Sequence, residues 1–485
     1  MTAASRDASS GAAEASAWPM LVGGEWRSGG EVIDVRNPFD GRLVATVPQG
    51  AAADADEALA AATAAAEQPF PAHARYQVLM RAAELVERQR DLYAATIAAE
   101  GSKTIREAQR EPVRAANLLR LSAEEGRRLA GETLPFDTRA GSENRIGYYF
   151  RFPVGVVGAV TPFNDPLAVA VHKIGPALAG GNAVVLKPAS ATPLSALRLA
   201  RHLLEAGLPP GRLSVVTGRG ETIGERLVQD PRVRMITFTG GVETGLRITR
   251  LAGIKKLSME LGSNSPVIVL ADADLGRAVP AIAAGAFAQA GQNCLGVQRV
   301  LVHEGVYESF RERFLAQVSR LTAGSSLDES TDVCAMINQA EARRVESWVS
   351  EAVEGGARVL AGGRREGAVV WPTVLEDVPD GVKLDREEVY GPVVSLYRVE
   401  SMDQAIERAN RVDYGLHAAI FTESLRDAFA AVQRLHVGGV MVNDSTDYRL
   451  DVMPFGGTKL SGNGREGIRF ALLEMTETRA VCLNL

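Results

Sequence analysis

Cys294 is the side chain of this sequence best suited to nucleophilic chemistry. It closes the segment Gly291-Gln292-Asn293-Cys294, directly after a stretch, Ala278–Ala290, whose pattern predicts a helix. A thiolate is a strong nucleophile where a helix N-terminus or a nearby cation lowers the pKa of the thiol. A lone cysteine is more commonly a buried apolar side chain, and this segment alone favours that interpretation.

Two polar residues follow predicted strands, where a bound molecule would meet them. Glu260 lies at the end of the apolar run Leu257–Leu261, and a partly buried carboxylate there would have a raised pKa suited to a general base. Asn164 follows Thr161-Pro162-Phe163, and its amide N–H would stabilise an oxyanion. Each has an ordinary alternative, in which Glu260 points outward to solvent and Asn164 forms an Asx turn.

A glycine series, Gly218-Arg219-Gly220 with Gly224, follows a predicted strand and opens a helix. Backbone amides at such a helix N-terminus bind phosphate groups. The spacing is GxGxxxG rather than the dinucleotide-binding GxGxxG, so a plain turn between strand and helix stays open as the alternative.

The elements that must position these residues alternate between strand and helix. A helical region from about Ala51 to Gly131 comes first, with apolar residues at helical spacing. Apolar runs then predict strands at Val154–Thr161, Asn182–Pro188, Leu213–Thr217, Met235–Thr239 and Leu257–Leu261. Helices are predicted between them, at Leu167–Ala179, Thr192–Gly207 with Thr192 as its cap, after Gly224, and at Glu243–Ala252. This alternation predicts an α/β fold with a parallel sheet.

A second series of strands predicts a second α/β domain. Its members are Val267–Leu270, Val300–Val302, Val369–Val374, Val393–Val399, Ala418–Phe421 and Val440–Asn443. Ligands of such sheets bind at the carboxyl ends of the strands. The last residues, Thr478–Leu485, are expected to form a strand with no partner nearby in sequence.

Composition narrows the class of protein. The chain has 485 residues and a net charge of −6. Its length exceeds the roughly 250–300 residues of a single core, so two or more domains are expected. It has no basic run, which argues against a nucleic-acid partner, and no apolar stretch of about 18 residues that would span a membrane. Its three cysteines lie far apart, which predicts neither disulfides nor a metal site and suits a reducing, cytoplasmic compartment. Residues 1–17 are expected to be a disordered tail.

The candidate segments occur in an order that resembles the aldehyde dehydrogenase superfamily, from about Trp18 to the end of the chain. The matching stretches are Asn37-Pro38, Thr161-Pro162-Phe163-Asn164, Lys173–Ala179, Leu186–Ser190, Phe238-Thr239-Gly240-Gly241, Glu260-Leu261-Gly262, Gly291–Cys294, Glu387–Pro392 and Pro454-Phe455-Gly456-Gly457. A chance match of so many ordered motifs is negligible.

The resemblance implies a role for each candidate catalytic residue. Cys294 attacks the aldehyde carbonyl, and the Asn164 amide and the Cys294 backbone N–H hold the oxyanion. Hydride transfer to the nicotinamide gives a thioester, and Glu260 activates the water that hydrolyses it. Lys173 matches a lysine near the proton path, with a surface lysine on a helix as the alternative.

The resemblance also implies a dinucleotide site for NADP or NAD and no metal. Its residues would be Thr161, Pro162, Phe163, Lys187, Ser190, Gly220, Gly224, Phe238, Thr239, Gly240, Gly241, Leu261, Gly262, Glu388 and Tyr390. Lys187 would contact the adenine ribose and Glu388 the nicotinamide ribose, while Tyr390 stands where relatives more often have Phe. NAD-selective relatives often have Glu where this chain has Ser190, so NADP should be accepted well.

The family fold implies three parts and a homodimer or homotetramer. A Rossmann-like cofactor domain would comprise residues 18–132 and 150–260, and an α/β catalytic domain residues 261–470. Residues 133–149 and 471–485 would form a small β oligomerisation arm, whose final strand would extend the sheet of a neighbouring subunit.

The small-molecule aldehyde that serves as substrate is less well defined. Ser263-Asn264-Ser265-Pro266 and the segment Asn443–Arg449 resemble a subgroup that acts on lactaldehyde, phosphonoacetaldehyde or glyceraldehyde 3-phosphate. Members that bind a phosphorus anion often have Arg where this chain has Asn293, which argues against a phosphate or phosphonate. Arg114 is a candidate anion contact, with a surface ion pair on its helix as the alternative, and Phe455 is a further candidate.

Two other functions compete with hydrolytic aldehyde oxidation. In CoA-acylating relatives CoA takes the acyl group, and these enzymes usually lack a carboxylate at the position of Glu260. A catalytically silent member of the fold would not need Cys294, Asn164 and Glu260 together. The sequence therefore favours the hydrolytic enzyme.

Overall fold

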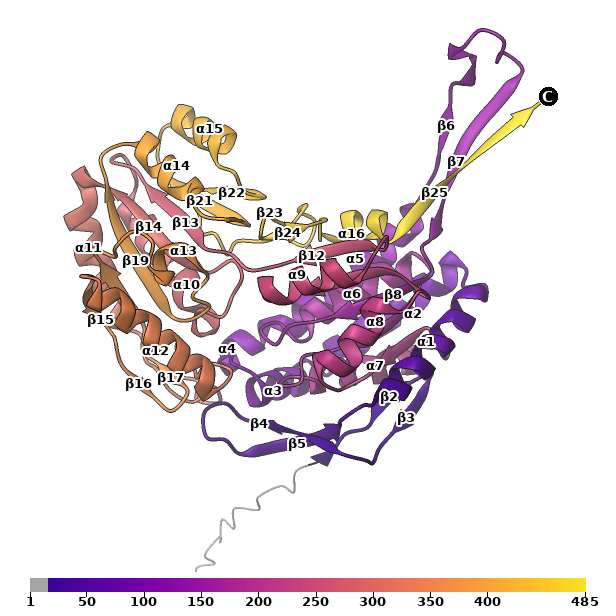
Figure 1. Ribbon diagram of the computed structural model, residues 1–485, viewed down its shortest axis with the longest axis horizontal. Helices are drawn as coiled ribbons and strands as arrows, with labels where there is room; N and C mark the ends of the chain where they lie inside the picture. Colours follow the sequence, from indigo (N-terminus) through magenta and orange to yellow (C-terminus); the bar gives the residue numbers. More distant parts are fainter. Residues whose placement is uncertain (1–15) are drawn as a thin grey trace, which may run out of the picture.

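The computed structural model describes residues 16–485, which form two large sheets and a projecting arm (Figure 1). The larger sheet has eight strands in the order β24-β12-β11-β8-β9-β10-β2-β3. These strands are β2 (Met20–Val22), β3 (Glu25–Arg27), β8 (Val156–Val160), β9 (Ala183–Lys187), β10 (Leu213–Val215), β11 (Val233–Thr239), β12 (Lys256–Glu260) and β24 (Gly462–Asn463). Strands β8 to β12 pair in parallel, which confirms the predicted α/β class.

Alternate side chains of β9 explain why helices cover both faces of this sheet. Val184 and Leu186 pack with one group of helices, whereas Ala183 and Val185 pack with another, because successive strand residues point to opposite faces. The first group is α2 (Ala72–Arg88), α3 (Arg90–Glu100), α5 (Arg110–Arg128), α6 (Ala168–Ala179), α7 (Leu194–Glu205) and α16 (Ile468–Glu474), with the short α4 (Ile105–Ala108) beside it. The second is α1 (Ala52–Glu67), α8 (Glu225–Gln229) and α9 (Val242–Leu251).

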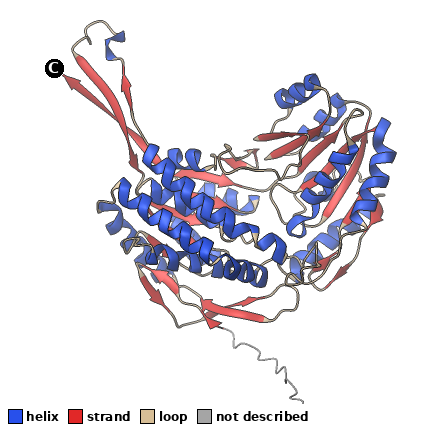
Figure 2. Cartoon of the chain, turned by 180° about the vertical axis from the view of Figure 1, so that it is seen from behind, coloured by secondary structure: helices blue, strands red, loops and turns tan. Residues whose placement is uncertain are grey.

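The second sheet has seven strands in the order β15-β18-β19-β14-β13-β21-β22 and is flanked by its own helices (Figure 2). Its strands are β13 (Ser265–Val269), β14 (Val297–His303), β15 (Arg358–Ala361), β18 (Thr373–Glu376), β19 (Val393–Val399), β21 (His417–Phe421) and β22 (Gly439–Val442). Its helices are α10 (Leu275–Phe287), α11 (Glu304–Val318), α12 (Gln339–Glu354), α13 (Lys383–Arg386), α14 (Met402–Asn410) and α15 (Leu425–Arg434). Two separate two-stranded antiparallel sheets accompany it: β16 (Arg365–Glu366) with β17 (Val369–Val370), and β20 (Tyr414–Gly415) with β23 (Thr458–Lys459).

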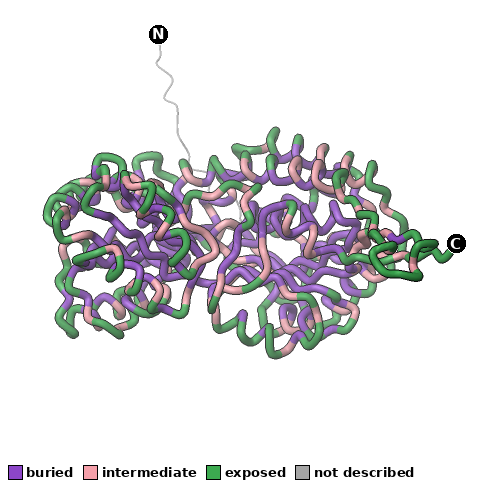
Figure 3. The backbone as a smooth tube through the Cα atoms, turned by 90° about the horizontal axis from the view of Figure 1, so that it is seen from above, coloured by how far each residue is buried: buried purple, intermediate pink, exposed green. Residues whose placement is uncertain are grey.

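The arm is a three-stranded antiparallel sheet of β6 (Glu132–Leu134), β7 (Arg145–Pro153) and β25 (Thr476–Asn484). The final strand pairs along its length with β7, from Thr476 with Pro153 to Asn484 with Arg145. Its partner is therefore distant in sequence but belongs to the same chain. The arm extends away from both domains, and most of its residues are exposed (Figures 1 and 3).

The N-terminal part contains strands that the sequence did not predict. Besides β2 and β3, the strands β4 (Val32–Arg36) and β5 (Leu43–Pro48) precede the helical region, and β1 (Ser16–Ala17) pairs with β5. Ser16 and Ala17 were expected to belong to the disordered tail, whereas residues 1–15 of that tail lie outside the described part. Within residues 16–485, no helix has the length and apolarity that crossing a membrane requires.

One predicted strand is divided. Val369–Val370 is β17 and pairs with β16, whereas Thr373–Glu376 is β18 and enters the large sheet. Pro372 separates them, and proline lacks the backbone N–H that a continuous ladder would need. The single predicted strand Val369–Val374 was wrong for this reason.

The N-terminus of α7 is capped by a residue that is distant in sequence. The carboxylate of Glu100, at the end of α3, accepts hydrogen bonds from the backbone N–H of Leu194 at 2.8 Å and of Ser195 at 3.0 Å, and from Ser195 Oγ at 2.6 Å. Thr192, the predicted cap, instead has a buried hydroxyl without a hydrogen-bond partner among the described residues. The prediction failed because the helix starts two residues later, at Leu194.

Replacing Glu100 by alanine should destabilise the protein by about 2–4 kcal/mol, because buried N–H groups at the start of α7 would lose their acceptor. Urea-induced unfolding measures the change. Glu205→Ala is the control, since Glu205 lies exposed at the other end of the same helix and its loss should change the unfolding free energy by less than about 0.5 kcal/mol. Equal stabilities of the two variants would contradict the capping role.

Candidate active site

Two cavities meet at Cys294. The larger, of about 620 Å³, lies between the carboxyl end of the eight-stranded sheet and helix α12, and the smaller, of about 310 Å³, extends from it toward α5 and α6. Both are lined by Asn164, Thr239, Glu260 and Cys294. A molecule in either cavity would therefore meet the same four side chains.

The backbone before Cys294 is folded tightly. Gln289, Ala290 and Gly291 have φ values of 54°, 53° and 69°, so the chain turns sharply after α10. A Cβ on Gly291 would lie 2.1 Å from the carbonyl oxygen of Gly391, so only glycine fits. Cys294 thus follows the C-terminal end of a helix and does not lie at an N-terminus that would lower the pKa of its thiol.

Burial raises the pKa of the Cys294 thiol well above its usual value, and the negative charge of Glu260 raises it further. Sγ makes a long hydrogen bond of 3.9 Å to Asn293 Oδ1, and a hydrogen bond to the Glu260 carboxylate also raises the pKa of the thiol. The thiol is therefore protonated at neutral pH in this state, and a nucleophilic role requires a base to take its proton.

Glu260 ends β12 and is 5% exposed, with its carboxylate in the cavity wall and not on the solvent face. Burial raises its pKa to about 7, and the charge of Glu466 adds to the effect. Its Oε1 accepts no hydrogen bond from the described residues. A carboxyl group that titrates near neutral pH and has a free oxygen is suited to accept a proton from a thiol or a water.

Asn164 is held at the cavity wall by buried ion pairs behind it. Its neighbour Asp165 forms an ion pair with Lys103, which also bonds Glu111 at 2.5 Å. Glu111 in turn accepts the backbone N–H groups of Leu167 and Ala168 at the start of α6. Asn164 Oδ1 is buried without a partner among the described residues, which leaves the amide available to a bound molecule.

Lys173 is 1% exposed and belongs to a buried polar network, so the surface-lysine alternative is wrong. Its Nζ donates to Thr237 Oγ1 at 3.1 Å and to Glu466 Oε1 at 3.2 Å, and Glu466 Oε2 accepts from Arg449 at 3.0 Å. Burial alone would raise the pKa of Glu466, but the charges of Lys173 and Arg449 together lower it. Glu466 is therefore ionised beside a Glu260 that titrates near pH 7.

Glu466 and Arg449 line the smaller cavity, and neither was predicted as a site residue. Both lie in irregular loops near the C-terminal end, where no periodic pattern identifies a functional side chain. The predicted substrate residues Arg114 and Asn293 line the same cavity.

Arg114 also forms an ion pair, with Nη2 2.8 Å from Asp451 Oδ1. It therefore lines the cavity, as expected for an anion contact, and has an acidic partner at the same time. Phe455 is placed behind this cavity: it packs against Leu295 and Leu416 and lies under the Arg449 guanidinium, 3.7 Å from the ring centroid. Its contact is with Arg449, and not with the cavity itself.

The larger cavity contains most of the predicted cofactor residues. They are Thr161, Pro162, Phe163, Phe238, Thr239, Gly240, Gly241, Leu261, Gly262, Glu388 and Tyr390. Helix α12 adds Glu341, Arg344 and Trp348, which were not predicted because the helix carries no motif and belongs to the other domain.

The local geometry of this cavity fits a dinucleotide. A Cβ on Gly240 would lie 2.6 Å from the Phe238 ring, and one on Gly262 would lie 2.3 Å from Glu388 Oε2, so glycines keep the space open. The hydroxyls of Thr161 and Thr239 are buried without partners among residues 16–485. Such orphaned groups are expected where a ligand completes the hydrogen bonding.

Glu388 lies in the wall of the larger cavity and accepts the Ser263 N–H at 2.8 Å. Burial raises its pKa to about 8. The Tyr390 ring meets Phe163 edge to face, with 5.9 Å between centroids.

A further cavity of about 600 Å³ lies between α8 and α9, and Gly220 and Gly224 are in its wall. Lys187 lies close by: a Cβ on Gly224 would be 3.8 Å from its Cδ, and burial lowers the pKa of its ammonium to about 8. Ser190 Oγ donates to the carbonyl of Gly218 at 3.0 Å and caps no helix. The predicted adenosine-side residues are thus grouped around the turn after β10.

A sequence profile of the aldehyde dehydrogenase family matches residues 26–481. The chain belongs to this family, and it is an oxidoreductase that acts on aldehydes with NAD or NADP.

Several relatives within the family are similar to this chain over nearly its whole length. An aspartate-semialdehyde dehydrogenase of Pseudomonas canavaninivorans is 48% identical over 93% of this chain and 97% of its own. A 3-sulfolactaldehyde dehydrogenase of Priestia aryabhattai is 46% identical over 96% and 98%. A lactaldehyde dehydrogenase of Methanocaldococcus jannaschii is 37% identical over 96% and 100%, which confirms the predicted subgroup similarity.

Among solved structures, the NADP-dependent glyceraldehyde-3-phosphate dehydrogenase of Bacillus halodurans, in complex with NADP, superimposes with a TM-score of 0.94. It is 38% identical, and the match covers 96% of this chain and 99% of the other.

Ser190→Glu should lower the ratio of kcat/KM for NADP+ to that for NAD+ at least tenfold. A carboxylate about 4 Å from a 2′-phosphate opposes it by roughly 4 kcal/mol per unit charge at an effective dielectric of about 20, and tenfold discrimination needs only about 1.4 kcal/mol. Ser190→Ala is the matched control, because it removes the bond to Gly218 without adding charge and should leave the ratio unchanged. A ratio that stays the same in Ser190→Glu would refute this placement of the adenosine ribose.

Proposed function

We propose that this enzyme oxidises a short aldehyde bearing an anionic group to the carboxylic acid, through a thiohemiacetal and a thioester on Cys294. The observation that supports it most is the convergence of Cys294, Asn164 and Glu260 where the two cavities join. The dinucleotide would occupy the larger cavity and the aldehyde the smaller.

The first step is attack of the Cys294 sulfur on the aldehyde carbon. Because burial keeps the thiol protonated, Glu260 takes the proton as the carbon–sulfur bond forms. The carbonyl oxygen becomes an oxyanion, and the Asn164 amide and the Cys294 backbone N–H donate to it. Bound in the larger cavity, NAD(P)+ would supply the acceptor for the hydride of the thiohemiacetal carbon, and Cys294 would then carry the thioester.

The second step is hydrolysis of that thioester. Once Glu260 has released the thiol proton, its carboxylate accepts a proton from a water, the hydroxide attacks the acyl carbon, and the Cys294 sulfur leaves as a thiolate. A pKa near 7 allows Glu260 to accept this proton and release it again at neutral pH. The buried ion pair of Lys173 with Glu466, whose charges both act on Glu260, offers a path for the proton.

Two guanidinium groups in the smaller cavity favour an anionic substrate. Arg114 and Arg449 both reach His172 Nε2, at 3.2 and 3.3 Å, so their charges lie close together in the wall. Arg449 Nε is buried without a partner within the described chain. The named substrates of three relatives, aspartate semialdehyde, 3-sulfolactaldehyde and glyceraldehyde 3-phosphate, all carry an anion. With Asn293 in place of arginine, we favour a carboxylate or sulfonate over a phosphate.

A CoA-acylating reaction is the second candidate. It would need no carboxylate that activates water, whereas Glu260 is present, buried and directed into the cavity. Reduction of NADP+ measured with and without CoA separates the two: a rate that depends on CoA would favour acyl transfer over hydrolysis.

We further propose a cytoplasmic homodimer or homotetramer built through the arm. Apolar side chains remain exposed on its strands, including Ile146, Phe150 and Leu483, and β22 is a free sheet edge with exposed Val442. An arm strand from a second copy would cover both surfaces. Light scattering after gel filtration measures the state, and Phe150→Asp should shift it toward the monomer.

Glu260→Gln should separate the two half-reactions. Hydride transfer precedes hydrolysis, so a burst of reduced cofactor, at most stoichiometric with sites, should precede turnover slowed at least a hundredfold, as expected for loss of a general base. Because Glu260 also takes the thiol proton, the burst should be slower and smaller than in the wild type. Stopped-flow absorbance measures the burst, and Cys294→Ala is the control that should show neither phase while still binding cofactor. Steady turnover of Glu260→Gln at the wild-type rate would refute Glu260 as the base.

Arg449→Met and Arg114→Met should each lower kcat/KM for succinate semialdehyde about 10- to 100-fold, the loss expected for a charged hydrogen bond. The rate with butanal, which has the same chain length without the charge, should change less than about threefold. Arg120→Met, on the exposed face of the same helix α5, is the control variant. Equal losses for both aldehydes would show that these arginines stabilise the cavity without recognising an anion.

A further inference from the structure

Gln298 bridges two segments that belong to different walls of the larger cavity. It lies on β14, close after Cys294, and is 7% exposed. Its Nε2 donates to the carbonyl of Ser263 at 2.8 Å, and its Oε1 accepts the N–H of Val389 at 2.8 Å. Both hydrogen bonds of the amide are therefore made to backbone groups.

These contacts close a ring of hydrogen bonds. The N–H of Ser263 donates to the carboxylate of Glu388, whose next residue is Val389. The peptide groups on either side of Ser263 are thus held by Glu388 at the N–H and by Gln298 at the carbonyl. A Cβ on Gly262 would lie 2.3 Å from Glu388 Oε2, so the Gly262 backbone packs directly against that carboxylate, and a rotation of the Ser263 peptide would move the carboxylate as well.

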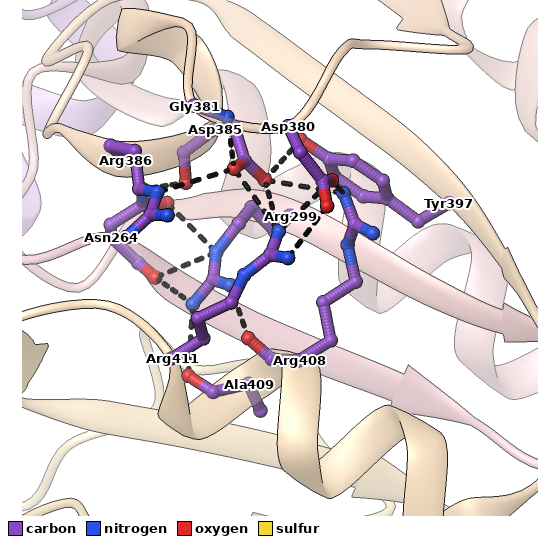
Figure 4. Close-up of polar contacts among 10 residues, drawn as sticks. All are labelled: Asn264, Arg299, Asp380, Gly381, Asp385, Arg386, Tyr397, Arg408, Ala409 and Arg411. Carbon is purple, nitrogen blue, oxygen red and sulfur yellow. Dashed lines mark hydrogen bonds and ion pairs between the residues drawn. The ribbon is translucent and has the colours of Figure 1, made fainter.

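The neighbouring side chain holds the chain in another way. Arg299 is fully buried and donates to Asn264 Oδ1 at 3.1 Å and to the carbonyls of Arg408 and Ala409 (Figure 4). Arg299 thus anchors the linker Leu261–Asn264, which joins β12 to β13, to α14. It does so on the opposite side of β14 from Gln298, since successive strand residues point to opposite faces. The attachment of the linker to the sheet therefore does not depend on Gln298.

We propose that Gln298 is a positioning residue for the nicotinamide-ribose half of the dinucleotide site, which it orders by holding Ser263 and, through it, Glu388. The inference rests on the proposed function, in which Glu388 would contact that ribose as the family resemblance implies. Gln298 touches neither cavity itself, and its effect passes through the ring of hydrogen bonds. Gln298 should have no effect on binding of the adenosine half of the dinucleotide, whose proposed site lies around Lys187 and Gly224.

The test compares ligands that contain one or both halves of the site. Isothermal titration calorimetry measures Kd for NADP+, NAD+ and ADP with wild type, Gln298→Met, Gln298→Asn and Glu388→Gln. Gln298→Met keeps the volume and loses both hydrogen bonds, and Gln298→Asn keeps a buried amide that is too short to span both backbone groups. Either variant suffices if the other does not fold.

Asn182→Leu is the matched control. Asn182 is also a buried amide that bonds only backbone groups, accepting from Gly155 N and donating to the carbonyls of Ala177 and Met475. It directly precedes β9 and so lies at the amino end of that parallel strand. The Asn182→Leu variant loses the same kind of hydrogen bonds, from a buried amide to backbone groups, far from the ribose site. Its Kd values for all three ligands should match those of the wild type.

We expect both Gln298 variants to weaken the preferred dinucleotide about five- to tenfold, in line with one or two lost hydrogen bonds, and to leave Kd for ADP within about twofold. KM for the dinucleotide should rise while KM for the aldehyde stays unchanged. Unchanged dinucleotide binding, or equal weakening of ADP, would overturn the inference. If Glu388→Gln binds both dinucleotides as tightly as the wild type, the proposed contact of Glu388 with the ribose is wrong. Weaker dinucleotide binding by Gln298→Met in that case would show that Gln298 does not act through Glu388.

Discussion

The parallel register between β13 and β14 is the constraint on which the site depends. Ser265 pairs with Val297, and these two residues begin their strands. Glu260 precedes the first strand by the short linker Leu261–Asn264, and Cys294 directly precedes the second. Pairing the two strands therefore brings Glu260 and Cys294, the proposed base and nucleophile, to one place between the two sheets. A shift of this register would separate them and would also move every core side chain of both strands.

Burial then assigns different tasks to chemically similar groups. Glu260 and Glu466 are both buried carboxylates near the same cavity, but Lys173 and Arg449 hold only Glu466 in its ionised form. Glu260 lacks such a partner and titrates near neutral pH. The same loss of water raises the pKa of Cys294, so the base and the nucleophile depend on one another. Separation of the pKa values of neighbouring groups is how a single site supplies both an acceptor and a fixed charge.

Buried carboxylates also hold the backbone that surrounds the site. Glu111 accepts the first N–H groups of α6, directly after Asn164, and Glu100 does the same for α7. Both come from the helical region that precedes the sheet in sequence. The helices that contribute no catalytic group thus fix the turn that presents Asn164. The Gln298 ring serves the corresponding purpose on the cofactor side, where it joins the linker after Glu260 to the segment of Glu388.

The sequence by itself determined the α/β class, the succession of the central strands along the chain and the segments that carry Cys294, Glu260 and Asn164. Those features depend on local periodicity and on short motifs, which can be read from neighbouring residues without knowing the tertiary contacts. Only the tertiary structure decided that Glu100 caps α7 in place of Thr192, that β25 pairs with β7, and that Arg449 and Glu466 line the smaller cavity. The physical reason is that each of these contacts joins residues far apart in sequence. A side chain that bonds a distant backbone group produces no periodic pattern in the sequence. The two groups come within bonding distance only when the chain has folded.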